Sequence, residues 1–122
     1  MSKGAKIGNY VGTGLLSALM LMSAGMYFGN NAEIVKEFTR MEFPTWIIYP
    51  LGVAKILGVA TLWFVKNKRL KMMAYAGFFF NILLAFGAHI GVGDGPEGWS
   101  GAAMGLVFWA LSFLFAIKTE KV

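Results

Sequence analysis

One lysine, Lys55, lies inside a long apolar segment and is the residue of this sequence best placed to do chemistry in an apolar setting. An ionisable side chain in a membrane-spanning helix costs roughly 2.5–3.5 kcal/mol on insertion scales, so it usually faces a partner or a cavity. Gly52 and Gly58 lie three residues away on either side, share its helical face and are expected to leave space around it. Lys55 therefore predicts either a polar contact within the protein or a binding site for an anionic or carbonyl-bearing ligand.

Three kinds of partner are open to Lys55. The expected spans contain no Asp or Glu, so the nearest carboxylates are those of the first loop, Glu33, Glu37 and Glu42. Asn81, at a similar depth in the next helix, is the second candidate, and a bound ligand is the third. A loop carboxylate can reach Lys55 if the first loop dips inward. Pro50 either kinks the helix that carries Lys55 or begins it, and in the second case Lys55 lies closer to the outer face.

His89 and Asp94 form a second candidate pair at the end of the third apolar segment. Histidine titrates near neutral pH, so His89 suits proton handling or ligand binding; alternatively, it orders the following loop through Asp94. A single histidine cannot supply both axial ligands of a bis-His haem, and the eight methionines are more typical of packing than of ligation. We find no cysteine, nucleotide loop, paired catalytic carboxylates or metal-binding cluster, so the sequence assigns no catalytic residue and no metal site.

Four apolar segments are long enough to position these residues within a bilayer. Of the 122 residues, 57% are hydrophobic and 14% are charged, whereas soluble domains carry roughly 25% charged residues. The segments cover about residues 7–28, 43–65, 72–92 and 99–117, close to the roughly 20 apolar residues that a spanning helix needs. The sequence therefore predicts one all-α membrane domain over residues 1–122, a four-helix transmembrane bundle.

The first segment also has features of a secretory signal. Its start is basic, and Ser23, Ala24 and Gly25 supply the small residues typical of a cleavage site. The apolar run nevertheless continues to Phe28, so we expect a retained first helix.

Lysine and arginine positions predict the orientation, because short basic loops stay in the cytoplasm. The basic residues gather at both ends and in the second loop: Lys3, Lys6, Lys66, Lys68, Arg69, Lys71, Lys118 and Lys121. The only charged residues of the third loop are Asp94 and Glu97. We predict a multi-pass protein of the inner (plasma) membrane with both termini cytoplasmic, and we attribute the net charge of +5 to this topology rather than to a nucleic-acid partner.

Small residues predict where the helices touch, because helices in lipid associate by close approach. The candidate contact pairs are Gly8 with Gly12 and Ala54 with Gly58. The third helix carries small and polar residues at steps of four on one face, namely Gly77, Asn81, Ala85 and His89. Tyr75 falls near the start of this helix, where tyrosine prefers the membrane–water interface.

Three motifs follow one another along the chain: Leu51-Gly52-Val53-Ala54-Lys55-Ile56-Leu57-Gly58, then Leu70-Lys71 followed by Ala74-Tyr75-Ala76-Gly77-Phe78, and finally His89-x-x-x-Gly93-Asp94, with Phe43-Pro44 preceding them. Together, and in this order, they resemble the DoxX-like membrane family. The resemblance implies a four-helix membrane protein with Lys55, Tyr75, His89 and Asp94 as site residues, to which the residue analysis adds Asn81. Better understood relatives are membrane subunits linked to quinone-dependent oxidation of sulfur compounds or to membrane oxidoreductases, and more distant ones are assembly chaperones. The absence of cysteine argues against direct thiol chemistry.

Three functions are consistent with these observations. The first is a subunit associated with membrane redox chemistry that binds a quinone or lipid-like ligand beside Lys55, at most a non-catalytic or partner-dependent part of an oxidoreductase. The second is a non-catalytic assembly or accessory subunit of a larger membrane complex, or a homo-oligomer. The third is a small anion transporter, because the intramembrane charge is a lysine rather than the carboxylate that small multidrug exporters use. The lipid bilayer is the partner common to all three.

Overall fold

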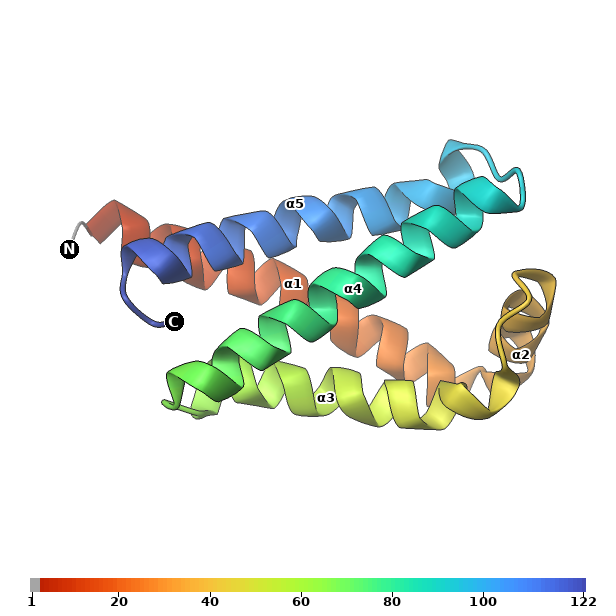
Figure 1. Ribbon diagram of the computed structural model, residues 1–122, viewed down its shortest axis with the longest axis horizontal. Helices are drawn as coiled ribbons and strands as arrows, with labels where there is room; N and C mark the ends of the chain where they lie inside the picture. The colour runs from red at the N-terminus through yellow and green to blue at the C-terminus, as the bar shows by residue number, and fades with distance from the viewer. Residues whose placement is uncertain (1–2) are drawn as a thin grey trace.

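The computed structural model describes residues 3–122, and every regular element in that range is helical (Figure 1). The long helices are α1 (Lys3–Gly29), α3 (Ile48–Phe64), α4 (Lys68–Gly91) and α5 (Pro96–Lys118). A shorter helix, α2 (Asn31–Arg40), and a 3-10 turn, η1 (Thr45–Ile47), join α1 to α3. Four segments of the described chain are long and apolar enough to cross a membrane: Lys3–Gly29, Thr45–Phe64, Lys68–Gly91 and Pro96–Lys118. The predicted all-α class with four long apolar helices is confirmed.

Helix α2 is not predicted by the sequence, because the segment between the first two spans is rich in polar residues, which is typical of a loop. It forms with one apolar side, on which the buried Phe38 packs edge-on against Tyr27 of α1 at 5.6 Å between ring centroids. Its exposed side carries the ion pair Lys36–Glu33 at 3.2 Å, a spacing of three residues that supports a short helix. The connection from α1 to α3 is therefore an ordered element that can take part in a site.

Pro50 lies in the first turn of α3, where the missing N–H removes no hydrogen bond from the helix. The helix begins two residues earlier, at Ile48, and η1 extends the second span back to Thr45. Lys55 therefore remains near the middle of this span.

The four long helices form a bundle in which α1 and α4 are each flanked by α3 and α5 (Figure 1). The start of α1, the C-terminus and the α3–α4 turn lie at one end, which we call the terminal end. Helix α2 and the α4–α5 loop lie at the other, which we call the α2 end. The predicted basic segments thus share the terminal end and the acidic third loop lies at the α2 end. The side of the membrane that each end faces remains a prediction.

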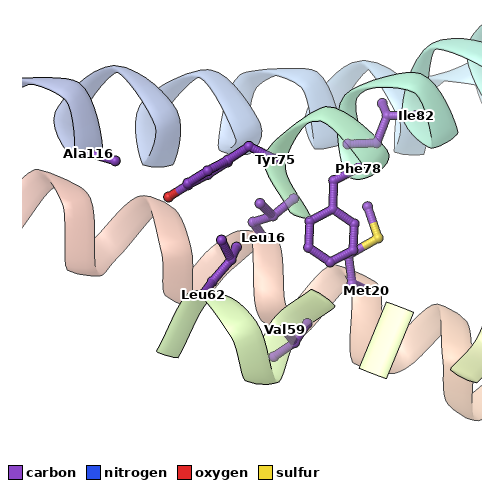
Figure 2. Packing of buried hydrophobic residues seen from close by; sticks show 8 residues of the cluster. All are labelled: Leu16, Met20, Val59, Leu62, Tyr75, Phe78, Ile82 and Ala116. Atoms are coloured by element: carbon purple, nitrogen blue, oxygen red, sulfur yellow. The ribbon is translucent and has the colours of Figure 1, made fainter. Parts of the chain in front are cut away.

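The core of the bundle contains side chains from all four long helices (Figure 2). Its buried members are Leu16, Met20, Val59, Leu62, Tyr75, Phe78, Ile82 and Ala116. Lipid is as apolar as these side chains, so their contribution comes from close packing rather than from escape from water.

Helices α1 and α5 approach each other closely at Gly12. A Cβ atom at this position would lie 2.5 Å from the backbone nitrogen of Ser112 and 2.9 Å from the carbonyl carbon of Leu111. One turn earlier, a Cβ atom at Gly8 would lie 2.7 Å from the ring of Phe115. The predicted contact through Gly8 and Gly12 is therefore present, and α5 is its partner.

Hydrogen bonds reinforce this contact in a group that we call the Ser112 cluster: Asn9, Thr13, Tyr75, Ser112 and Lys121. The Ser112 hydroxyl lies 2.6 Å from Thr13 Oγ1 and 2.7 Å from the Tyr75 hydroxyl, and Asn9 Nδ2 donates to the Ser112 carbonyl at 2.8 Å. Lys121 Nζ donates to Asn9 Oδ1 at 2.7 Å from beyond the end of α5. Such bonds join helices in a membrane, where lipid offers no alternative partner.

We predict that Gly12→Ala destabilises the bundle by about 1–3 kcal/mol, because the added methyl group meets the α5 backbone rather than a movable side chain. Unfolding in mixed detergent micelles, followed by circular dichroism, measures the change. Gly14→Ala is the control, because a Cβ atom there meets nothing within 4 Å. Equal stabilities of the two variants would mean that α1 and α5 do not approach closely at Gly12.

Candidate functional site

A cavity of about 630 Å³ lies toward the α2 end of the bundle, and we call it the main cavity. Residues of all five α-helices line it, and its surface is mostly apolar. Its polar lining residues are Ser23, Tyr27, Glu37, Lys55, Asn81, His89, Glu97 and Ser100. Both its volume and its few polar groups are typical of a small-molecule site. Three of the five predicted site residues, Lys55, Asn81 and His89, thus lie on one cavity.

Lys55 is 6% exposed, and its contacts come from α1. The ammonium donates to Ser23 Oγ at 2.6 Å and lies 4.0 Å from the centroid of the Tyr27 ring. Ser23 and Tyr27 are one helical turn apart, so they present a hydroxyl and an aromatic face to the same cation. Neither was singled out from the sequence as a site residue, although their spacing of four on a spanning helix was the available signal.

The protein partners expected for Lys55 do not pair with it. Within residues 3–122, no carboxylate oxygen lies within 4.0 Å of its nitrogen: Glu33 pairs with Lys36 and Glu37 with Arg40. Asn81 borders the same cavity but makes no hydrogen bond to Lys55. Of the three kinds of partner considered, only a bound ligand is still compatible with these contacts.

The two glycines that flank Lys55 do not leave the space expected of them. A Cβ atom at Gly52 would lie 2.8 Å from the ring of Phe28, and one at Gly58 would lie 2.5 Å from the ring of Phe78. The glycines admit aromatic side chains of α1 and α4 instead. The space beside Lys55 is therefore provided by the divergence of whole helices rather than by the absence of side chains on α3.

Two smaller cavities adjoin the main one. The second, of about 420 Å³, lies between α3 and α4, and the third, of about 330 Å³, is lined by α1, α2, η1, α3 and α4. Lys55 borders the first two, and Asn81 borders all three. The predicted polar face of the third span is thus directed at these cavities, because Gly77, Asn81, Ala85 and His89 each line at least one.

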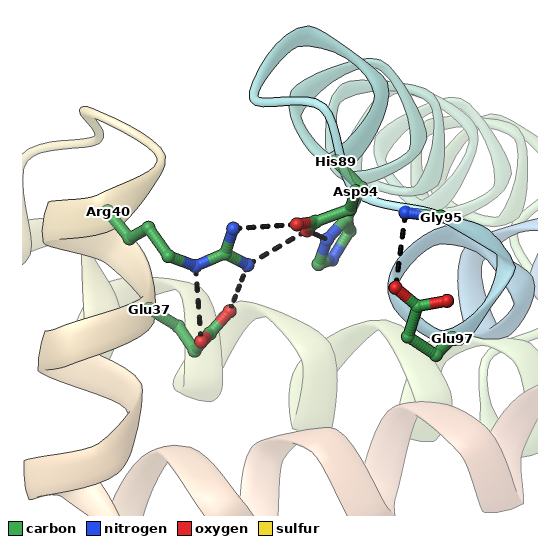
Figure 3. A network of polar contacts seen from close by, with 6 residues as sticks. All are labelled: Glu37, Arg40, His89, Asp94, Gly95 and Glu97. Atoms are coloured by element: carbon green, nitrogen blue, oxygen red, sulfur yellow. Dashed lines mark hydrogen bonds and ion pairs between the residues drawn. The ribbon is translucent and has the colours of Figure 1, made fainter.

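A group of charged residues joins α2 to the α4–α5 loop at the rim of the main cavity (Figure 3). We call it the Arg40 clamp: Glu37, Arg40, His89 and Asp94. Arg40 binds the Asp94 carboxylate through two nitrogens, each at 2.8 Å, and donates to Glu37 at 2.8 Å. His89 Nδ1 lies 2.6 Å from Asp94 Oδ2, so the expected ordering of the loop by His89 and Asp94 is present. Arg40 was missed because the sequence did not predict α2.

The clamp shifts the protonation of its own members. Hydrogen bonds from Arg40, and then from His89, lower the pKa of Asp94 to about 2. The same bond to Asp94, followed by that to Glu37, raises the pKa of Arg40. Both groups are therefore charged at neutral pH, and the two-pronged geometry is the one that a guanidinium and a carboxylate favour.

Tyr75 lies apart from all three cavities. It is 3% exposed, its hydroxyl belongs to the Ser112 cluster and its ring packs against Phe113 at 5.1 Å between centroids. The structure thus buries this side chain instead of leaving it at the membrane interface, because Ser112 of α5 supplies a hydrogen-bond partner inside the bundle.

We predict that Tyr75→Phe lowers the free energy of unfolding by about 1 kcal/mol, because it removes one interhelical hydrogen bond. We expect it to leave any ligand of the main cavity in place. Unfolding in mixed micelles, together with the lipid content of the purified protein, tests both statements. Loss of a ligand at unchanged stability would instead assign Tyr75 to the site.

A second prediction concerns the Arg40 clamp and pH. The pKa of Asp94 is lower in the folded protein than its ordinary 3.8, so the clamp contributes stability above pH about 4 and loses it as the pH falls toward 2. Asp94→Asn should lower the melting temperature near neutral pH, and the difference from wild type should vanish over that acid range. Glu33→Gln is the control, because Glu33 forms only an exposed pair within α2. A difference that persists at pH 2 would contradict the assignment.

Within residues 3–122, no group of three His, Asp or Glu side chains could hold a metal ion. Comparison with protein families gives one match, in which the model described as the DoxX-like family covers residues 11–115. No curated protein and no solved structure matches the chain significantly. The matched range includes the main cavity, the Arg40 clamp and most of the Ser112 cluster, and it confirms the resemblance carried by the three motifs. The chain is a small membrane protein of the DoxX-like family.

Proposed function

We propose that this protein binds a quinone or lipid-like molecule in the main cavity, with Lys55 as the principal polar contact. The observation that carries the proposal is the buried ammonium of Lys55, which borders a largely apolar cavity and has no carboxylate partner within residues 3–122. An ammonium has three N–H donors, and one of them donates a hydrogen bond to the Ser23 hydroxyl oxygen. A ligand oxygen would accept another.

The polar residues of the cavity suit a ligand with separated oxygens. Lys55 and Asn81 can donate from the deep part of the cavity, and His89 lies near the rim within the Arg40 clamp. A quinone presents two carbonyl oxygens on a flat apolar ring, and a lipid presents its oxygens at one end. Both fit a cavity that is apolar apart from a few donors.

A link to membrane redox chemistry is part of this proposal and rests on the family resemblance. The chain has no cysteine, so a thiol of this protein cannot take part. Electron transfer at this site would therefore run through the ligand and a partner protein, and this chain would hold and orient the ligand.

An accessory role in a larger membrane complex is the second candidate. Its support is a set of uncovered glycines that line none of the three cavities and at which an added Cβ atom would meet nothing within 4 Å: Gly14, Gly25, Gly87 and Gly91. Small residues let the helices of another membrane protein approach closely.

The test is mass spectrometry of the organic extract from protein purified in mild detergent. We expect wild type to retain one quinone or lipid in stoichiometric amount. Lys55→Met should retain at least about tenfold less of it, because a hydrogen bond from a charged group to the ligand is lost. Lys118→Met is the matched control: Lys118 is exposed, lies 5.6 Å from the Phe115 ring and borders none of the three cavities.

The two candidate functions give different results in this experiment. Ligand in wild type and Lys118→Met but not in Lys55→Met supports a binding site. No ligand in any of the three proteins, with the same protein partners recovered from each, would contradict it and support the accessory role.

A further inference from the structure

The positive charge of Lys55 is not neutralised by the protein. The described residues form four ion pairs, and all four involve α2 or the α4–α5 loop at the α2 end. The two acidic residues that line the main cavity bind other groups. Glu37 pairs with Arg40, and Glu97 accepts a hydrogen bond from the backbone N–H of Gly95 at 3.2 Å. His89 is bound to Asp94. A neutral ligand would therefore leave a buried cation without a counter-charge, whereas an anionic one would supply it.

Asn81 adds a second, independent indication of a polar head group. Its side chain borders all three cavities and has no hydrogen-bond partner within residues 3–122. An amide offers two N–H donors and one acceptor, so it can bind a carboxylate beside the lysine. Lys55 and Asn81 both line the main and the second cavity, so a ligand that occupies either cavity can reach both residues.

The second cavity has the surroundings of a hydrocarbon chain. It runs between α3 and α4 from Leu51 to Thr61, a distance of roughly 15 Å along a helix. Apart from Lys55, Asn81 and Thr61 its lining is apolar, and the Thr61 hydroxyl is occupied by the Leu57 carbonyl at 2.8 Å. Its border includes Leu70 and Met73, which are exposed on the surface that would face lipid.

We propose that the ligand is a single-chain amphiphile with one acidic head group, of which a fatty acid is the simplest case. Lys55 and Asn81 hold its carboxylate, and its chain lies between α3 and α4. This inference rests on the proposed function and narrows the ligand class. One ammonium balances one negative charge, and among the described residues no second lysine or arginine lines the main or the second cavity, so a doubly charged phosphate monoester is a poorer match.

Gly77 provides a way to test the position of the chain. It lines the second and third cavities, and an added Cβ atom would meet nothing within 4 Å, so a larger side chain at this position extends from an uncrowded backbone. Gly87, on the same helix, is equally uncovered but lines none of the three cavities. Gly77→Leu and Gly87→Leu are therefore the same substitution inside and outside the proposed site.

The experiment is equilibrium binding of radiolabelled oleic acid, oleyl alcohol and a short-chain ubiquinone to the delipidated protein in mild detergent at neutral pH. We expect wild type to bind the acid about tenfold or more tightly than the alcohol, because only the acid pairs with Lys55. Lys55→Met should remove this preference and Lys55→Arg should keep it. Gly77→Leu should weaken binding of both the acid and the alcohol, and Gly87→Leu should leave binding unchanged.

The outcomes separate this inference from the proposed function. If the alcohol or the quinone binds as tightly as the acid, the acidic head group is wrong while ligand binding stands. If Gly77→Leu and Gly87→Leu act alike, the position of the chain is wrong. If none of the three compounds binds to wild type, both proposals fail. Lys55→Arg and the glycine variants keep the test decisive should Lys55→Met not fold.

Discussion

Lipid offers no hydrogen-bond partner, so every polar group within the spans has to be satisfied by the protein or by a ligand. Within residues 3–122, no fully buried side-chain nitrogen or oxygen lacks a hydrogen bond. Two sites meet this requirement in different ways. Ser112 is completely buried; its carbonyl accepts a hydrogen bond from Asn9, and its hydroxyl bonds to those of Thr13 and Tyr75. The Lys55 ammonium contacts one hydroxyl, that of Ser23, and one aromatic face, that of Tyr27, and it borders a cavity.

These two sites correspond to the two ends of the bundle. At the terminal end, the Gly12 contact draws α1 against α5, and the Ser112 cluster joins both to α4. Toward the α2 end, α1 and α5 diverge, as Figure 1 shows, and the main cavity occupies the interior. The Arg40 clamp then ties α2 to the α4–α5 loop, which stabilises the open end without filling it (Figure 3). A bundle that is closed at one end can hold a ligand at the other at little cost to its fold.

This arrangement gives the family motifs separate physical roles. The motif around Lys55 borders the main cavity, and the motif that ends in Gly93 and Asp94 forms part of its rim. The motif that contains Tyr75 is divided, because Tyr75 belongs to the Ser112 cluster whereas Gly77 lines the second cavity. The family motifs therefore contain both positions that line a cavity and positions that hold the helices together.

The sequence by itself determined the four spans and the end of the bundle to which each loop belongs, because apolar length and loop connectivity are local properties. It also placed Asn81, Ala85 and His89 on one face, since helical periodicity is local as well. It did not predict α2, a short amphipathic helix that forms because Phe38 packs against Tyr27. Only the tertiary structure decided the partners: Ser23 rather than Asn81 for Lys55, Arg40 for Asp94 and Ser112 for Tyr75. Those choices depend on how helices distant in the sequence rotate and diverge, and helical periodicity carries no information about that.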